Sequence, residues 1–157
     1  YLGGYVPGEP WSFGADTILR RIIVTEAISR YQVLKWDQVS SLANQIELLP
    51  TSSLVDLSEI LSRTENVNPT VKSRLANALR NRLNLQGSEM GIADQNFPSP
   101  WWILGSKDYT SARLLIWTLR EPSYEKDRPR LVKGLLKRQI RGRWDTTLGN
   151  AYAVLAL

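Results

Sequence analysis

The sequence predicts an all-α fold built from stacked helical hairpins, arranged in a ring or a solenoid. Apolar residues recur every three or four positions along most of the 157-residue chain, and no stretch shows a clear two-residue alternation. Helix-starting residues (Asp, Ser, Asn or Thr) precede several of these stretches. Strongly amphipathic stretches also alternate with a nearly apolar one, which indicates outer helices with one wet face and inner helices with neighbours all round.

Three helices are expected in the first part of the chain. Asp16 is the expected cap of a helix that runs to about residue 31, and Asp37 caps a second that runs to about residue 49. Pro50 ends the second helix, and a third restarts at once with Ser53 as its cap. In the first helix, the residues expected to face the core are Ile18, Leu19, Ile22, Ile23, Ala27 and Ile28.

The stretch "NVNPTVKSRLANALRNRLNL", residues 66–85, carries the clearest helical signal. Asn68 is a cap, Pro69 occupies the first helical position, and an apolar line repeats every four residues. We expect one amphipathic helix lying on a core, with its inner line formed by Val71, Leu75, Leu79 and Leu83.

Residues 86–107, "QGSEMGIADQNFPSPWWILGSK", break the helical pattern. Gly, Pro and Ser favour an irregular loop, and a short hairpin is the alternative. A long loop inside a compact domain usually has its own packing or a purpose. Trp101 and Trp102 would supply that packing.

Three more helices follow, at about 108–120, 129–140 and 146–157, with "EPSYEKDRP" as a linker before the second of them. The helix at 129–140 is amphipathic, whereas the one at 146–157 is almost wholly apolar. This pair is typical of an outer and an inner helix of one hairpin.

The composition excludes several chemistries. With no Cys and no His, the chain has no disulfide, no thiolate nucleophile, no Cys/His zinc site and no ordinary neutral-pH base. No apolar run approaches the roughly 20 residues that span a bilayer. The beginning, "YLGGYVPGEP", lacks the pattern of a signal peptide. Its glycines are only a weak match to a phosphate-binding loop.

Carboxylates are therefore the only plausible acids and bases. Asp56 and Glu59 are the nearest approach to a pair, and we interpret them as solvated side chains on a helix surface. Asp108 and Asp145 stand at expected helix starts, where capping and compensation of the helix dipole are the favoured roles. We expect no catalytic residue, no metal and no cofactor.

The net charge of +5 is concentrated in one stretch, which we call the basic stripe: Lys126, Arg128, Arg130, Lys133, Lys137, Arg138, Arg141 and Arg143. A solvated helix face is the favoured interpretation. The alternative is contact with an anionic surface through Arg130, Lys133, Lys137 and Arg141, with an affinity that falls steeply as salt rises.

The run "RGRWDTTLGNAYAVLAL" resembles the final hairpin segment of the bacterial alpha-2-macroglobulin-like proteins, which carry a Gly-x-Trp-(Asp/Ser)-Thr-Thr/Gln-x-x-Asn-Ala pattern. The segments "LPTSSLVDLSEIL", "RLNLQGSEMG", "PWWILGSKDYTSARLL" and "DRPRLVKGLLKRQIRGRW" are similar, in the same order, to the same domain of the large members. The opening "GGYVPGEPWSFGADTILRRI" fits more loosely, so the resemblance spans nearly the whole chain.

This resemblance implies an alpha/alpha toroid of inner and outer helices. It also implies that residues 1–157 are one partial domain, truncated from a much larger multidomain protein. Thioester-bearing members open this domain with Cys-Gly-Glu-Gln, whereas this sequence has no Cys and no Gly-Glu-Gln. The block around Trp101 and Trp102 resembles the branch without the thioester, so the covalent trapping mechanism does not transfer to any residue here.

The implied function is that of a non-catalytic domain in a protease-trapping defence protein of the periplasm, cell envelope or extracellular space. Its partners would be neighbouring beta-sandwich domains and, through the parent protein, target proteases. We expect no nucleic-acid partner and no insertion into a membrane. The candidate interface residues are Trp101, Trp102, Arg113 and Trp144, although core packing is the alternative for each and is favoured for Trp144.

A second hypothesis is a ligand-binding toroid, with or without enzymatic activity, whose tryptophans line a cavity for glycans or isoprenoids. It predicts acidic residues converging inside an open cavity. For the six tryptophans, packing between helices is the favoured interpretation. Because a partial toroid would expose apolar helix faces, we also expect dimerisation or missing neighbours.

Overall fold

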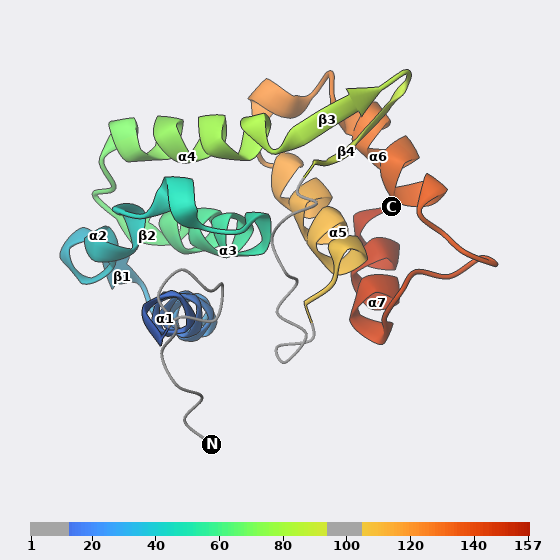
Figure 1. Cartoon of the computed structure of the whole chain (residues 1–157). Coiled ribbons are helices and arrows are strands. Elements are labelled where there is room, and N and C mark those ends of the chain that lie inside the picture. Colours follow the sequence, from blue (N-terminus) through green and yellow to red (C-terminus); the bar gives the residue numbers. More distant parts are fainter. Residues whose placement is uncertain (1–12, 94–104) are drawn as a thin grey trace. The chain divides into compact units, whose positions relative to one another are not determined.

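A computed structural model describes residues 13–93 and 105–157, with side chains from residue 17 onward. The fold is mostly helical (65%), with seven α-helices and two small two-stranded sheets in the described part of the chain (Figure 1). The helical prediction is therefore confirmed, whereas the sheets depart from a purely α-helical class. By contact, the chain divides into two compact units, Tyr1–Ala78 and Leu79–Leu157.

The first unit contains three complete helices and the start of a fourth. Its elements are α1 (Phe13–Ser29), β1 (Leu34–Lys35), α2 (Trp36–Ala43), a 3-10 turn (Ile46–Leu48), α3 (Thr51–Ser62), β2 (Thr64–Glu65) and the beginning of α4 (Pro69–Asn81). Strands β1 and β2 pair in parallel, two residues each. A strand this short leaves no periodic signal in the sequence, which is why neither was expected.

The corner between the second and third helices lies earlier than predicted. Helix α2 ends at Ala43 and a separate 3-10 turn follows. Pro50 occupies the N-cap position of α3, with φ −65° and ψ 157°, so the helix begins at Thr51. Ser53 is a buried residue inside α3, and the prediction that it caps the helix is wrong. Proline already holds the φ that a helix start needs, so the helix begins directly after it.

Helix α1 packs on α3 through a partly polar face. Ile22 is fully buried as predicted, but Ala27 and Ile28 are exposed, and the buried positions further along are Glu26 and Ser29. The predicted apolar line is therefore wrong in its second half. Arg63 lies opposite α1 and draws the carboxylate and the hydroxyl inward, which rotates the buried face.

The amphipathic helix at 66–85 is confirmed at its start and corrected at its end. The Asn68 side chain accepts a hydrogen bond from the Thr70 amide (2.9 Å), and Pro69 is the first residue of α4. Leu75 and Leu79 are buried. The helix ends at Asn81, however, and Leu83 belongs to a strand.

The second unit opens with a β-hairpin where the sequence indicated first a helix and then a loop. Strands β3 (Leu83–Gln86) and β4 (Glu89–Ile92) are antiparallel, and Gly87 in the turn has φ +61°. A left-handed conformation suits glycine and turns the chain tightly. The hairpin alternative is thus confirmed, and the hairpin begins three residues before the predicted loop. Residues 94–104 of that loop lie outside the described residues.

The other elements of this unit are α5 (Lys107–Thr118), a 3-10 turn (Pro122–Tyr124), α6 (Arg128–Lys137) and α7 (Thr147–Ala156). Helix α5 packs on α7, and α6 packs on α5 and β4. A Cβ atom on Gly134 of α6 would lie 2.1 Å from the Met90 backbone oxygen, so only glycine allows this close approach. The cluster at the centre of the unit comprises Ala112, Leu115, Leu131, Leu135, Trp144, Ala153 and Ala156.

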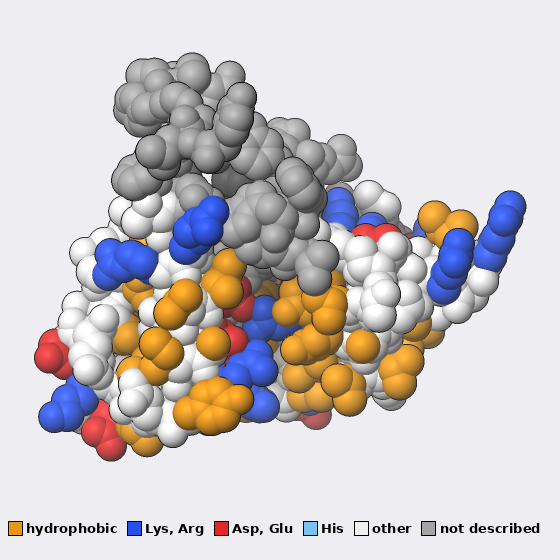
Figure 2. Space-filling view, turned by 90° about the horizontal axis from the view of Figure 1, so that it is seen from below, with side chains coloured by type: hydrophobic (Ala, Val, Ile, Leu, Met, Phe, Trp, Pro, Cys, Tyr) orange, Lys and Arg blue, Asp and Glu red, His pale blue; other side chains and the backbone are white. Residues whose placement is uncertain are grey.

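Among the described residues, helix α3 is more enclosed, and helix α7 more exposed, than the sequence indicated. Almost every residue of α3 is buried, so it has the environment of an inner helix. Helix α7 buries only a line of small residues, Gly149, Ala153 and Ala156. Its other side exposes Val154 and Leu155, each 71% accessible. Figure 2 shows hydrophobic side chains exposed on the face that includes α7.

Candidate functional site

The segment that carries the family resemblance forms a corner between α6 and α7, and it begins with a tight turn. Ile140 and Arg143 exchange two backbone hydrogen bonds, of 2.8 and 3.3 Å. The two residues between them, Arg141 and Gly142, have φ values of +55° and +76°. Two positive φ values in a two-residue loop are those of a type I′ turn, which reverses the chain in the smallest possible space.

Trp144 anchors this corner in the core. Its side chain is 7% exposed, and the indole N–H donates to the Leu135 carbonyl at the end of α6 (2.9 Å). Asn150 holds the Trp144 backbone from the other side: the amide oxygen accepts from the Trp144 N–H (3.1 Å), and the amide nitrogen donates to the Trp144 carbonyl (3.0 Å). The tryptophan is thus fixed through both its side chain and its backbone.

The start of α7 is held by short polar side chains. Thr146 is the N-cap, and its hydroxyl accepts from the Gly149 amide (2.9 Å). Ser106 caps α5 in the same manner, accepting from Tyr109 (3.0 Å), while its own hydroxyl donates to the Asp145 carboxylate (2.9 Å). The two helix starts are therefore tied together directly.

Asp108 is the buried charge at this corner, with a side chain only 3% exposed. One carboxylate oxygen contacts the Arg138 guanidinium, and the other accepts from the Asp145 backbone N–H (2.9 Å). The carboxylate thus joins α5 to the end of α6 and to the start of α7. The predicted capping roles of Asp108 and Asp145 are wrong, because Ser106 and Thr146 are the caps.

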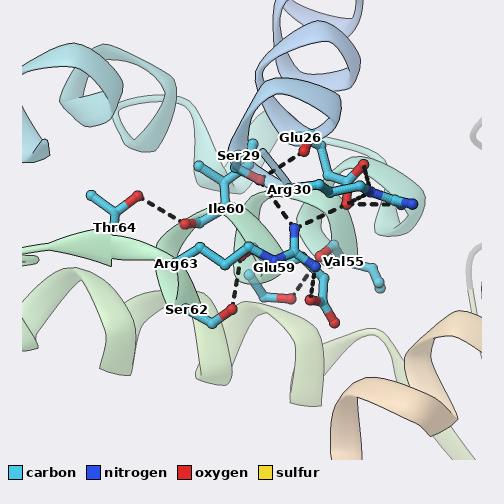
Figure 3. Close-up of polar contacts among 10 residues, drawn as sticks. Glu26, Ser29, Arg30, Val55, Glu59, Ile60, Ser62, Arg63 and Thr64 are labelled. Atoms are coloured by element: carbon cyan, nitrogen blue, oxygen red, sulfur yellow. Dashed lines mark hydrogen bonds and ion pairs between the residues drawn. The ribbon is translucent and has the colours of Figure 1, made fainter. Parts of the chain in front are cut away.

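A second buried polar cluster lies between α1 and α3 in the first unit (Figure 3). Arg63 donates to Glu26 (3.2 Å), Ser29 (3.0 Å) and Glu59 (2.7 Å). The Arg30 Nε–H donates to both carboxylate oxygens of Glu26, at 3.0 and 3.1 Å. Both glutamate side chains are less than a tenth exposed.

The solvated surface predicted for Asp56 and Glu59 is therefore wrong, since these residues are 8% and 7% exposed. Helical spacing located the two carboxylates on one helix but could not show that α3 has no solvent-facing side. Glu59 forms an ion pair with Arg63, which lies one helical turn further along the chain. Pairs at this spacing are common on solvent-exposed helices, so the spacing does not indicate that Glu59 is buried.

The basic stripe separates into structural and solvent-facing cations. Arg128 donates to the carbonyls of Thr118, Leu119 and Glu121 and so closes the end of α5. Arg138 binds Asp108, as described above. Of the predicted anionic-surface contacts, Arg130 faces Asp127 (3.6 Å) and Lys137 pairs with Glu89 (2.7 Å). Lys133 and Arg141 are exposed and make no side-chain contact with the described residues.

The candidate interface residues fall into different environments. Trp101 and Trp102 lie outside the described residues. Arg113 is half-buried on α5, with its guanidinium 5.5 Å from the centre of the Tyr109 ring. Trp144 is part of the core described above. Of the four, the structure therefore describes only Arg113, which is half-buried, and Trp144, which is in the core.

Tyr124 is a buried residue that the sequence did not single out, because it lies in the predicted linker. It is fully buried and packs edge-on against Trp117, with ring centres 5.2 Å apart. The Arg80 guanidinium lies 4.3 Å from the centre of its ring. Burial raises the pKa of the phenol from 10.0 to about 12, with smaller contributions from the charges of Arg80, which lowers it, and of Glu121 and Asp127, which raise it.

A half-open cavity of about 230 Å³ lies between the β3–β4 hairpin and α6. The second hypothesis requires tryptophans and several converging acids. The described lining instead contains no tryptophan, and its one acid, Glu89, is paired with Lys137. Representative lining residues are Asn84, Gly91, Lys107, Gly134 and Arg138.

The described residues lack two features, a metal-binding group and a membrane-spanning helix. They contain no group of three or more acidic, His or Cys side chains placed to bind a metal ion. None of their helices is both long and apolar enough to cross a membrane. No protein-family model, curated protein or solved structure matches the chain.

Proposed function

We propose that the chain is a non-catalytic helical domain of a bacterial alpha-2-macroglobulin-like protease trap, acting in the cell envelope or outside the cell. The observation that carries this proposal is the corner at 142–151. Of the seven residues that match the family pattern, Thr147 and Ala151 aside, five have structural roles there: Gly142 lies in the turn, Trp144 is in the core, Asp145 accepts from Ser106, Thr146 is the N-cap, and Asn150 binds the Trp144 backbone. These roles maintain a shape, which supports a non-catalytic function.

The environments of the helices are in keeping with the proposed toroid. Helix α3 is enclosed, as an inner helix would be. Helices α4 and α6 have one buried line and one charged side, as outer helices would have. The exposed side of α7, with Val154 and Leu155, is the kind of surface that an adjoining hairpin would cover. In a toroid such a surface is interior, and its burial adds stability in proportion to the apolar area removed from water.

In such a trap, this domain would be a rigid body that docks on beta-sandwich neighbours and is repositioned after a protease cuts a bait segment elsewhere. That role needs two docked states that differ by a few kcal/mol, and it needs no active site. The double tie of Ser106 and Asp108 to Asp145 supports such rigidity, because it joins the starts of α5 and α7 through short side chains.

The test uses the full-length natural product that contains this chain. Its intact mass, domain order and solution scattering profile are measured before and after limited proteolysis. We expect a very long chain with beta-sandwich modules, a single early cleavage outside this domain, and a compaction that accompanies the cut. Cleavage without any change in shape, or a natural product no longer than this domain, would contradict the proposal.

A further inference from the structure

The turn Ile140–Arg143, which we call the basic tip, presents an aliphatic side chain among cations at an exposed position. Ile140 is 75% exposed, although isoleucine is among the residues most often buried. The segment between α6 and α7 extends away from both helices (Figure 1). Arg141 and Arg143 are exposed, and neither makes a side-chain contact with the described residues.

The geometry of the turn fixes how these side chains lie. Ile140 and Arg143 are directly opposite each other in the bridge, so their side chains point to the same face of the turn. Arg141 occupies a left-handed position that asparagine or glycine adopts with less strain. The chain thus holds a cation at a place where turn chemistry alone favours a neutral residue.

The exposed side of α6 carries the same two kinds of side chain as the tip. Lys133 and Leu136 lie three residues apart on one side of this helix, which ends at Lys137, and Ile140 follows in the turn. Lys133 is exposed, and Leu136 is 43% exposed. On α6 these two side chains lie away from the buried residues Leu131 and Leu135, so a cation and an aliphatic side chain are both exposed before the tip.

We propose that the basic tip, with Lys133 and Leu136 beside it, is a peripheral contact site for an anionic membrane surface. Peripheral helices bind such surfaces by placing aliphatic side chains at headgroup depth while cations neutralise lipid phosphates. A convex tip suits a bilayer, which adapts to it. Nucleic acid is the less favoured partner, because the tip offers an aliphatic side chain where single strands need an aromatic platform.

The contact is confined to the membrane surface, and it goes beyond the proposed trapping function because it does not depend on the parent protein. The probe is a set of vesicles of phosphatidylcholine alone or of phosphatidylcholine with phosphatidylglycerol. We expect the chain to sediment with the anionic vesicles and not with the neutral ones. Raising the salt concentration should weaken binding but not remove the part that comes from Ile140.

Four variants, R141N, R141N/R143Q, I140S and K126Q, divide the interaction into its parts. R141N/R143Q should lower partitioning by roughly fivefold for each cation removed, while asparagine keeps or improves the turn. I140S leaves the charge unchanged and should lower partitioning by roughly tenfold. K126Q is the matched control: it removes one exposed cation before the start of α6, at the end opposite the tip, and should change binding by less than R141N alone.

Far-ultraviolet circular dichroism establishes that each variant keeps the helical content of the parent chain. The proposal is overturned if neutral and anionic vesicles bind equally, if neither binds, or if K126Q weakens binding as much as R141N. It is also overturned if I140S binds anionic vesicles as the parent does. In that case binding is purely electrostatic, and a parallel titration with duplex DNA or polyglutamate would assign the tip to nucleic acid or exclude it.

Discussion

The two units each bury carboxylates that form ion pairs with arginine, but the other groups that bind these carboxylates differ. Between α1 and α3, two glutamates share Arg63 through long side chains alone. At the corner of α5, α6 and α7, the short side chain of Asp108 meets Arg138 and a backbone N–H within a framework of helix caps. Both clusters join distant positions, but only the second includes helix caps, Ser106 and Thr146, and helix caps are what leave a local signal in the sequence.

The largest effect is expected from removing the shared cation of the first unit. R63M leaves Glu26 and Glu59 buried with their common partner gone, and losing one member of a buried ion pair typically costs about 3–5 kcal/mol. Urea unfolding followed by circular dichroism measures this loss.

The triple variant E26M/E59M/R63M sharpens this result, because replacing all the buried charges with apolar side chains is often neutral. We expect it to recover at least half of the stability that R63M loses. A triple variant that is less stable than R63M would show that the cluster contributes net stability and is not merely self-neutralising.

The corner of the second unit should be somewhat more tolerant. R138M removes the cation beside Asp108, but the Asp145 N–H remains as a hydrogen-bond donor, so we expect a loss of about 3 kcal/mol, at the lower end of the range for buried pairs. K137M is the matched control at the neighbouring position: its pair with Glu89 is largely exposed, and surface pairs contribute about 0–1 kcal/mol. Equal losses of unfolding free energy in R138M and K137M would contradict this expectation, because the buried Asp108–Arg138 pair would then contribute no more than an exposed pair.

The smallest effect appears only in alkali. Because the folded state raises the pKa of Tyr124 from 10.0 to about 12, it keeps a proton that the unfolded chain releases. The contribution to stability is therefore complete below pH 10 and is lost as the pH rises to about 12. Y124F keeps the ring contacts with Trp117 and Arg80 but has no proton to lose, so its stability should fall less steeply over this window. Identical pH profiles for the two proteins would contradict the buried phenol.

Much of the fold could be predicted because helices are local. Asn68 and Pro69 mark the start of α4, since capping depends on residues a few positions apart. The start of α7 was predicted to within about one residue, although its N-cap is Thr146 and not the predicted Asp145. The errors come from longer-range effects: Leu83 left the predicted helix because it pairs with Ile92 in the hairpin, and α1 turned Glu26 inward because of a partner 37 residues away.

The candidate site was predictable to the same degree. The run 141–151 pointed to a motif, and the motif proved to be a structural corner. Asp108, the buried carboxylate at this corner, was predicted to act only at the start of its own helix. Its partners Arg138 and Asp145 come from later in the sequence, so no local pattern connects them. Tyr124 gave no signal, since a tyrosine in a polar linker resembles any exposed aromatic residue.

By itself the sequence determined the helical class, the approximate positions of most helices, the absence of Cys and His chemistry, and the position of the basic stripe. Only the tertiary structure decided which carboxylates are buried. It also decided which cations of the stripe bind groups at helix ends and which remain exposed on the tip, and it showed that α3 is more enclosed than α7. The physical reason is that capping and periodicity act within a few residues, whereas burial and ion pairing depend on which surfaces meet.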